Sequence, residues 1–115
     1  TPYGRSARSP LVSSATSYET LLFGIASLSP GRASLVFEFD AEDCYLRYNY
    51  KLLSGGSTTT TTLTAITTRA QPTSTLSGLT AGERYLFWLE GYRHTTQLKL
   101  YAWSARERRM TTAEQ

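Results

Sequence analysis

Few residues in this 115-residue chain are of the types that perform catalysis. The chain has one histidine, His94, and one cysteine, Cys44. Nucleophilic hydrolysis needs a Ser, Thr or Cys within reach of a base, which is commonly His. A zinc site needs about three or four His, Cys or carboxylate ligands, and no Gly-rich phosphate loop is found in the sequence. We therefore expect no enzyme activity, no metal site and no cofactor, and we interpret His94 as a solvated turn residue.

An acidic group between Glu38 and Asp43 is the remaining candidate for chemistry. The segment Asp40-Ala41-Glu42-Asp43 offers carboxylate oxygens, of the kind that Ca²⁺ binds in sets of about six to eight. It lacks the calcium-loop pattern, and a glycosidase would need two carboxylates facing each other in a cleft. We interpret residues 40–43 as a solvated polar loop.

The single cysteine excludes a disulfide within the chain. Free cysteine is among the most buried residue types and behaves as a small hydrophobic residue. We therefore interpret Cys44 as part of the core, with a free thiol available for pairing with another chain as the alternative.

The net charge of +3 raises the question of nucleic acid binding, because clustered Lys and Arg neutralise phosphates. Most basic residues stand alone between polar or apolar neighbours, and the only close group is Arg106, Arg108 and Arg109. A solvated tail explains this group equally well. We do not expect nucleic acid binding, whose signature would be an affinity that falls steeply with salt.

The segments that would position any site are predicted to be β-strands. From Thr20 onward, runs of apolar or β-branched residues alternate with clusters of Gly, Pro, Ser and Asp. Seven such runs predict an all-β antiparallel sandwich of about seven strands over residues 20–106. Residues 1–19 are predicted to be a polar linker or N-terminal arm, and residues 107–115 a polar C-terminal tail. No apolar run approaches the roughly 20 residues of a membrane span, so no membrane insertion is expected.

Alternation within these runs predicts which side of each strand is buried, because successive side chains point to opposite faces. Residues 34–40 are half-buried, and their apolar side consists of Leu35, Phe37 and Phe39. In residues 44–51 the apolar side consists of Leu46, Tyr48 and Tyr50, opposite Arg47, Asn49 and Lys51. Residues 85–92 are apolar on both faces, with Tyr85, Phe87, Leu89 and Gly91 opposite Leu86, Trp88, Glu90 and Tyr92. Residues 98–105 repeat this case, with Leu98, Leu100 and Ala102 alternating with Lys99, Tyr101 and Trp103.

A threonine-rich tract spans residues 57–68. Threonine is β-branched and suits a strand, so residues 58–67 are predicted to form an edge strand entered through the turn Ser54-Gly55-Gly56-Ser57. Three interpretations of the tract from Thr58 to Thr68 stay open: a polar edge, a site of O-glycosylation, and an edge that pairs with another chain.

Residues 76–89, with Gly78, Leu79, Gly82 and Tyr85, resemble the corner between strands E and F of fibronectin type III domains. The resemblance implies that Tyr85 heads strand F and that its hydroxyl bonds to main chain a few residues upstream. It implies strands at 21–27, 35–39, 46–50, 58–67, 74–76, 85–92 and 98–104. The structural residues it implies are Phe39, where the family usually has a core tryptophan, together with Tyr48, Leu79 and Tyr85. The fold is thus predicted to be fibronectin type III-like or immunoglobulin-like, with an unrelated small β-barrel as the competitor.

That resemblance also implies a candidate site. It places strand F between strands G and C, so Trp88 is expected beside Tyr101 and Trp103 on one side and Arg47 and Asn49 on the other. The partner-binding residues predicted on this face are Arg47, Trp88, Tyr92, Tyr101 and Trp103. Trp, Tyr and Arg dominate interface hot spots, and exposed aromatic rings also stack on sugars. The alternative is that the face is covered by the 1–19 arm or by a neighbouring domain.

Together these observations predict a non-catalytic interaction or structural module of a larger extracellular, cell-surface or virion-surface assembly. The expected partner is a protein, or a neighbouring domain or subunit of the same assembly, bound through the aromatic and arginine face or through an edge strand. The alternative function is carbohydrate recognition by exposed Trp and Tyr side chains.

Overall fold

The computed structural model describes residues 10–109, without the side chains of residues 33 and 106–109, and shows eight β-strands and no helix in that range. The strands are β1 (Leu11–Ser13), β2 (Glu19–Ser27), β3 (Arg32–Glu42), β4 (Cys44–Leu52), β5 (Thr59–Thr62), β6 (Thr73–Ser77), β7 (Arg84–Arg93) and β8 (Leu98–Arg109). The predicted all-β class is therefore correct for this part of the chain. Five of the predicted strands are recovered with ends that differ by a few residues, at β2, β3, β4, β6 and β7.

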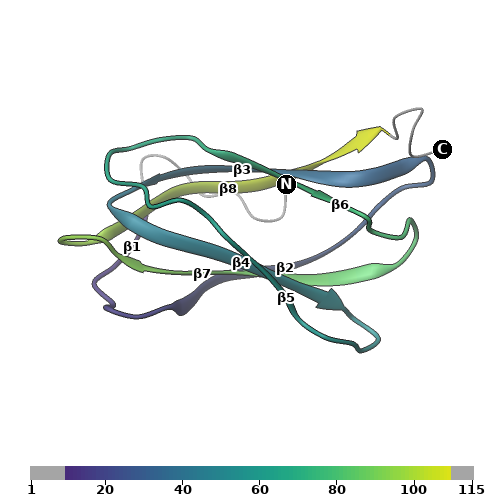
Figure 1. Cartoon of the computed structure of the whole chain (residues 1–115), viewed down its shortest axis with the longest axis horizontal. Helices are drawn as coiled ribbons and strands as arrows, with labels where there is room; N and C mark the ends of the chain where they lie inside the picture. Colours follow the sequence, from purple (N-terminus) through teal and green to yellow (C-terminus); the bar gives the residue numbers. More distant parts are fainter. Residues whose placement is uncertain (1–9, 110–115) are drawn as a thin grey trace.

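The strands form two four-stranded antiparallel sheets that lie as two layers (Figure 1). One sheet has the order β1-β8-β3-β6 and the other the order β2-β7-β4-β5. The prediction that the last strand lies beside β7 is wrong, because β8 pairs with β3 and β2 occupies the place beside β7.

The core lies between the two layers and is centred on Phe37 of β3. The ring centroid of Phe37 is 4.7 Å from that of Tyr48 on β4, 5.4 Å from that of Phe87 on β7 and 6.0 Å from that of Trp103 on β8. All four side chains are at most 1% exposed. Burial of each contributes about 1.5–3 kcal/mol, which makes this cluster the main attraction between the sheets. Tyr48 also joins the sheets through a hydrogen bond between its hydroxyl and that of Ser74, at 2.7 Å.

A β-bulge in β8 overturns the predicted orientation of its side chains. Leu100 pairs with Ala41 and Ala102 pairs with Asp40, so Tyr101 is an extra residue in the ladder. A one-residue insertion reverses the faces of all side chains that follow it. Trp103 consequently joins the core with Leu100, and the expectation that it lies on an outer face is wrong.

The sandwich extends beyond the predicted domain boundaries. β1 pairs with β8 through residues 11–13, and Leu11 packs against the core, so this part of the expected arm belongs to a sheet. At the other end β8 continues to Arg109 and includes the first residues of the predicted tail. The remainder of both predictions, residues 1–9 and 110–115, lies outside the described residues.

The predicted acidic loop is a tight turn. Asp40 and Glu42 belong to β3, Cys44 opens β4, and only Asp43 lies between the strands, with a positive φ of 55°. The Asp43 carboxylate accepts hydrogen bonds from the backbone N–H groups of residues 95, 96 and 97 and from the Thr95 hydroxyl. These bonds, led by that from the Thr95 hydroxyl, hold the pKa of Asp43 well below its usual range. Asp43 therefore ties the β3–β4 turn to the β7–β8 turn and is not a solvated loop residue.

The predicted corner bond of Tyr85 is present. The Tyr85 hydroxyl accepts a hydrogen bond from the backbone N–H of Thr80 at 2.9 Å, five residues upstream. Tyr85 is 7% exposed and Leu79 is 9% exposed, so both of these predicted structural residues are buried. Phe39 and Tyr48, the other predicted structural residues, are 1% exposed.

The threonine tract provides an edge strand, as predicted, but a short one. β5 covers only Thr59–Thr62 at the margin of its sheet, and it pairs with β4. Gly55 and Gly56 in the preceding turn have positive φ angles of 128° and 137°, which explains the two glycines at that position. After β5 the chain crosses to the other sheet, and Ile66 forms an isolated bridge with Cys44.

Candidate interaction face

The outer side of the β2-β7-β4-β5 sheet carries most of the solvent-accessible aromatic side chains of the described residues. We call it the aromatic face and define it by Tyr18, Phe23, Ile25, Tyr45, Arg47, Leu86, Trp88, Glu90 and Tyr92. Strands β4 and β7 provide its centre, and their register places side chains on it in rows across the sheet. Three of the predicted partner-binding residues lie on this face: Arg47, Trp88 and Tyr92.

The row that contains Trp88 is the most open part of the face. Trp88 pairs with Phe23 on β2 and with Asn49 on β4. Phe23 is 74% exposed, and Ile25, which pairs with Leu86, is 45% exposed. A hollow of about 290 Å³ opens here, and its lining residues are Thr20, Phe23, Lys51, Leu86 and Trp88. The face thus presents an apolar ridge with a shallow hollow beside it.

The middle of the face is polar and internally paired. Glu90 accepts hydrogen bonds from Arg47 Nε and from Asn49 Nδ2, each at 2.8 Å. The Thr60 hydroxyl donates to Asn49 Oδ1, so both ends of the amide have partners. Asn49 was predicted on the outer side and lies there, yet it is only 4% exposed because these neighbours cover it. Burial of a polar group costs little when its hydrogen bonds are made.

The far end of the face is a packed aromatic group. The Tyr92 ring stacks on Tyr45 and meets the edge of Tyr18, with centroids 4.7 Å apart in both cases. The guanidinium carbon of Arg47 lies 3.9 Å from the Tyr18 ring centroid. Burial here, with a smaller effect of Tyr92, raises the pKa of Tyr18. Tyr18 belongs to the predicted 1–19 arm, so that segment covers this end of the face and leaves the Phe23 end open.

Two predicted partner-binding residues lie elsewhere. Trp103 is in the core, for the reason given above. Tyr101 belongs to the other sheet, where its hydroxyl donates to Glu42 at 3.1 Å and its ring centroid lies 3.7 Å from the Arg69 guanidinium carbon. The predicted site therefore combined residues of both sheets, because it assumed that β8 lies beside β7.

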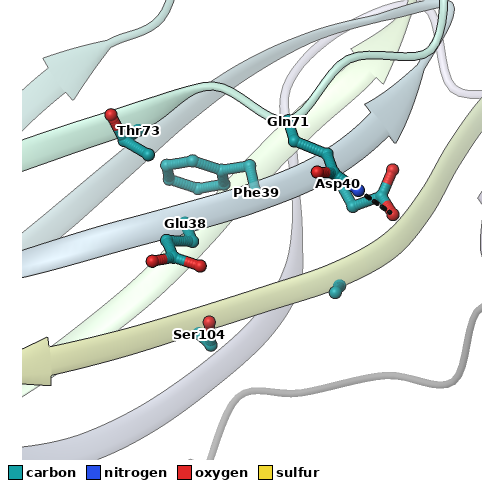
Figure 2. Close-up of a pocket in the computed structure, with 7 residues that line it drawn as sticks. Glu38, Phe39, Asp40, Gln71, Thr73 and Ser104 are labelled. Carbon is teal, nitrogen blue, oxygen red and sulfur yellow. Dashed lines mark hydrogen bonds between the residues drawn. The ribbon is translucent and has the colours of Figure 1, made fainter.

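A second hollow lies over β3 and β8 on that other sheet. It has a volume of about 370 Å³, and Figure 2 shows the residues that line it, among them Glu38, Asp40, Gln71, Thr73 and Ser104. Arg69 binds the two oxygens of Asp40 through two hydrogen bonds of 2.9 Å, and Gln71 adds a third at 3.3 Å. The bonds from Arg69 lower the pKa of Asp40, so this carboxylate stays ionised and is a poor proton donor.

Phe23 and Ile25 are the residues of the face that sequence reasoning did not select. The pattern Phe23-Gly24-Ile25-Ala26 contains a signal, since both large residues of the run point to one side and both small ones to the other. The resemblance obscured this signal, because it placed residues 85–92 between residues 98–104 and residues 46–50. Pairing of β2 with β7 is what brings Phe23 onto the same face as Trp88.

The residues whose side chains could take part in a reaction or bind a metal are held in structural contacts. Cys44 is fully buried, and burial, with a smaller effect of Asp43, raises the pKa of its thiol to about 12. His94 lies in the turn between β7 and β8, where its Nδ1 is 3.7 Å from Asp43 Oδ1 and its ring packs near Tyr45. Within residues 10–109 no group of three or more His, Cys, Asp or Glu side chains is placed to hold a metal ion. The backbone of residues 106, 108 and 109 belongs to β8, but their arginine side chains lie outside the described part.

No family model, no curated protein and no solved structure matches the chain. The resemblance to fibronectin type III domains therefore rests on the residues of the chain alone. Among the described residues, no helix is long and apolar enough to cross a membrane.

Proposed function

We propose that the chain is a non-catalytic β-sandwich module of a larger extracellular, cell-surface or virion-surface assembly, and that it binds a protein partner through the aromatic face. The observation that carries the proposal is the 74% exposure of Phe23 beside Trp88 and Ile25. Solitary exposed apolar residues are normal, but a contiguous group on a flat face is typical of an interaction surface. Phe, Trp, Tyr and Arg are also the residue types enriched in interfaces.

The remainder of the face supports this proposal because its side chains are already held in place. Arg47 is fixed by Glu90 and by the Tyr18 ring, and Tyr92 is packed between two other tyrosines. A partner that docks here would therefore immobilise few side chains. Preorganisation of this kind lowers the entropy cost of binding.

Carbohydrate recognition is the alternative function, and the hollow beside Trp88 favours it. Thr20 and Lys51 line that hollow and offer polar groups near an aromatic ring. Phe23 and Leu86 make up much of the remaining lining, however, and a sugar needs several polar partners for its hydroxyls. Because the lining of the hollow is mainly apolar, it favours a protein partner.

The type of sandwich is a proposal as well. The Tyr85 corner supports an immunoglobulin-like or fibronectin type III-like domain. The strand order supports a jelly roll, because β8 lies beside β3 and not beside β7. The corner concerns one loop, whereas strand order concerns the whole sandwich, so we favour the jelly-roll type. Fold type by itself does not indicate function.

The proposal is tested by affinity capture from the secreted and cell-surface proteins of the organism that makes the chain. Three immobilised forms are compared: the wild-type chain, Phe23→Ser on the aromatic face, and Leu53→Ser as a control. Leu53 is 41% exposed and lies in the turn after β4. Its backbone N–H donates to the carbonyl of Arg84, which pairs with Ser27 at the end of β2, four residues along the strand from Phe23. A protein retained by the wild type and the control, but lost with Phe23→Ser, supports the proposal.

A glycan array probed with the wild type and Trp88→Ala separates the two functions. Binding to defined glycans that Trp88→Ala abolishes, without any protein sensitive to Phe23→Ser, would replace the proposal with carbohydrate recognition. Equal capture by all three immobilised forms would refute a role for this face.

A further inference from the structure

The outer edge of β2 is the longest apolar strand edge in the described part of the chain. β2 has nine residues and stands at the margin of its sheet, and within residues 10–109 its only strand partner is β7. The other marginal strands are shorter: β1 has three residues, while β5 and β6 have four and five and consist almost entirely of Thr and Ser. A marginal strand presents unpaired N–H and C=O groups to any strand that approaches it.

From Leu22 to Ser27, β2 also lacks the features that usually prevent such pairing. From Thr20 to Ser27 it contains no charged residue and no proline. Its only irregularity is the register shift between Thr20 and Leu22, after which the ladder with β7 is regular to Ser27. Exposed marginal strands are commonly protected by lysine, proline, bulges or short length. In β2 the segment beyond the bulge instead carries the exposed side chains of Phe23 and Ile25.

We propose that the protein partner of the aromatic face is a second copy of this chain, with β2 of one copy paired antiparallel to β2 of the other. This inference rests on the function proposed above and names its partner. Pairing would continue one four-stranded sheet into the next. A two-fold axis through Gly24 places Phe23 of each copy opposite Ile25 of the other, at the separation of about 5 Å that is usual for directly opposed side chains.

The residues of β2 favour the same strand of a second copy as the pairing partner. The two-fold axis brings Phe23 of one copy against Ile25 of the other, and the same contact is repeated on the other side of the axis. The two apolar pairs thus form without any further side chain. Because the segment carries no charge, two copies bring no like charges together, and a charged partner strand gains nothing there. Trp88 and Leu86, the neighbours of Phe23 and Ile25 on β7, would flank the new contact in each copy.

The test is sedimentation equilibrium of the full chain over a wide range of concentration. Two double variants are compared with the wild type, Phe23→Lys with Ile25→Lys, and Phe23→Glu with Ile25→Glu. Both positions are exposed in the single chain, so charges there leave the fold intact, which circular dichroism and thermal unfolding check. Leu53→Lys and Leu53→Glu are the matched controls at an exposed leucine outside β2.

We expect the wild type and both controls to form dimers with the same dissociation constant. Each double variant should weaken its own dimer by about a hundredfold or more, because like charges would face each other across the axis. An equimolar mixture of the two double variants should restore a dimer, since opposite charges then meet.

A wild-type chain that stays monomeric to millimolar concentration, or dimers unaffected by the charged residues, would overturn the inference. A chain that dimerises only after removal of residues 1–9 would overturn it too, because those residues would then occupy the β2 edge. Capture of a heterologous protein that is lost with Phe23→Ser would still support the proposed function after any of these results. The failure of self-association is thus distinguishable from the failure of the proposed function.

Discussion

The two tryptophans are predicted to differ sharply in what they contribute to folding. Trp103 is fully buried and its ring stacks 6.4 Å from Phe39 and 6.0 Å from Phe37, whereas Trp88 lies half-buried on the aromatic face. Replacement of a core tryptophan by alanine costs about 3–5 kcal/mol, a large part of the 5–15 kcal/mol that stabilises a typical domain. Trp103→Phe is therefore the informative variant, because it keeps a ring in the core and should still fold.

We expect Trp103→Phe to lower the free energy of unfolding by about 1–3 kcal/mol through the space it leaves in the core. At about 4–8 °C per kcal/mol for a domain near this size, the melting temperature should fall by roughly 4–24 °C. Trp88→Phe should change the free energy of unfolding by no more than about 1 kcal/mol. Thermal unfolding followed by circular dichroism measures both.

Fluorescence of the same two variants gives an independent readout. Trp103→Phe leaves Trp88 as the only emitter, and its emission should be red-shifted and quenched by acrylamide. Trp88→Phe leaves Trp103, whose emission should be blue-shifted and protected. Red-shifted, quenchable emission from Trp103, with little loss of stability in Trp103→Phe, would show that β8 has no bulge at Tyr101 and that its register after Leu100 is wrong by one residue.

Three further predictions concern groups that the structure places in defined contacts. Tyr85→Phe should lower the free energy of unfolding in urea by about 1 kcal/mol through loss of the bond from the Thr80 N–H, whereas Tyr50→Phe, a partly buried tyrosine nearby, should cost less. The pKa of Asp43 is lowered in the folded chain, so its stabilising effect is present above about pH 4 and is lost as the pH falls further. Asp43→Asn should consequently be less stable than the wild type at pH 7, and the difference should shrink on acidification; a constant difference from pH 7 to pH 2 would contradict this. Cys44, with a thiol pKa of about 12 and no exposure, should react with a thiol reagent at pH 8 only after unfolding in urea.

Local patterns predicted the strands well because each pattern is a property of consecutive residues. Alternation of Leu35, Phe37 and Phe39 identified the inner side of β3, and that of Leu46 and Tyr48 identified the inner side of β4. The resemblance placed residues 85–92 beside residues 46–50, and β7 does pair with β4, so Arg47, Trp88 and Tyr92 share the outer face.

The sheet to which a strand belongs is a long-range property, and it was not predictable from these patterns. β8 has apolar residues on both of its sides, so its composition suits a position beside β3 as well as one beside β7. Its bulge at Tyr101 left no signal in the sequence, because an extra residue in a ladder is defined only by the partner strand. Asp43 is a similar case, since its role depends on N–H groups of residues 95–97, which lie about fifty residues away in the chain.

Because β2 occupies the place beside β7 that was predicted for the last strand, the candidate site has a different composition but the same position. Trp103, which was predicted in the site, lies in the core, and Phe23 lies beside Trp88 instead. The stability of the fold and the proposed interaction should therefore depend on different residues: a change at Trp103 should act on folding, and a change at Phe23 should act on binding. Phe23 is 74% exposed in the single chain, so its replacement removes little buried area and its effect on folding should be small. A loss of association with Phe23→Ser can consequently be assigned to the surface itself and not to a damaged fold.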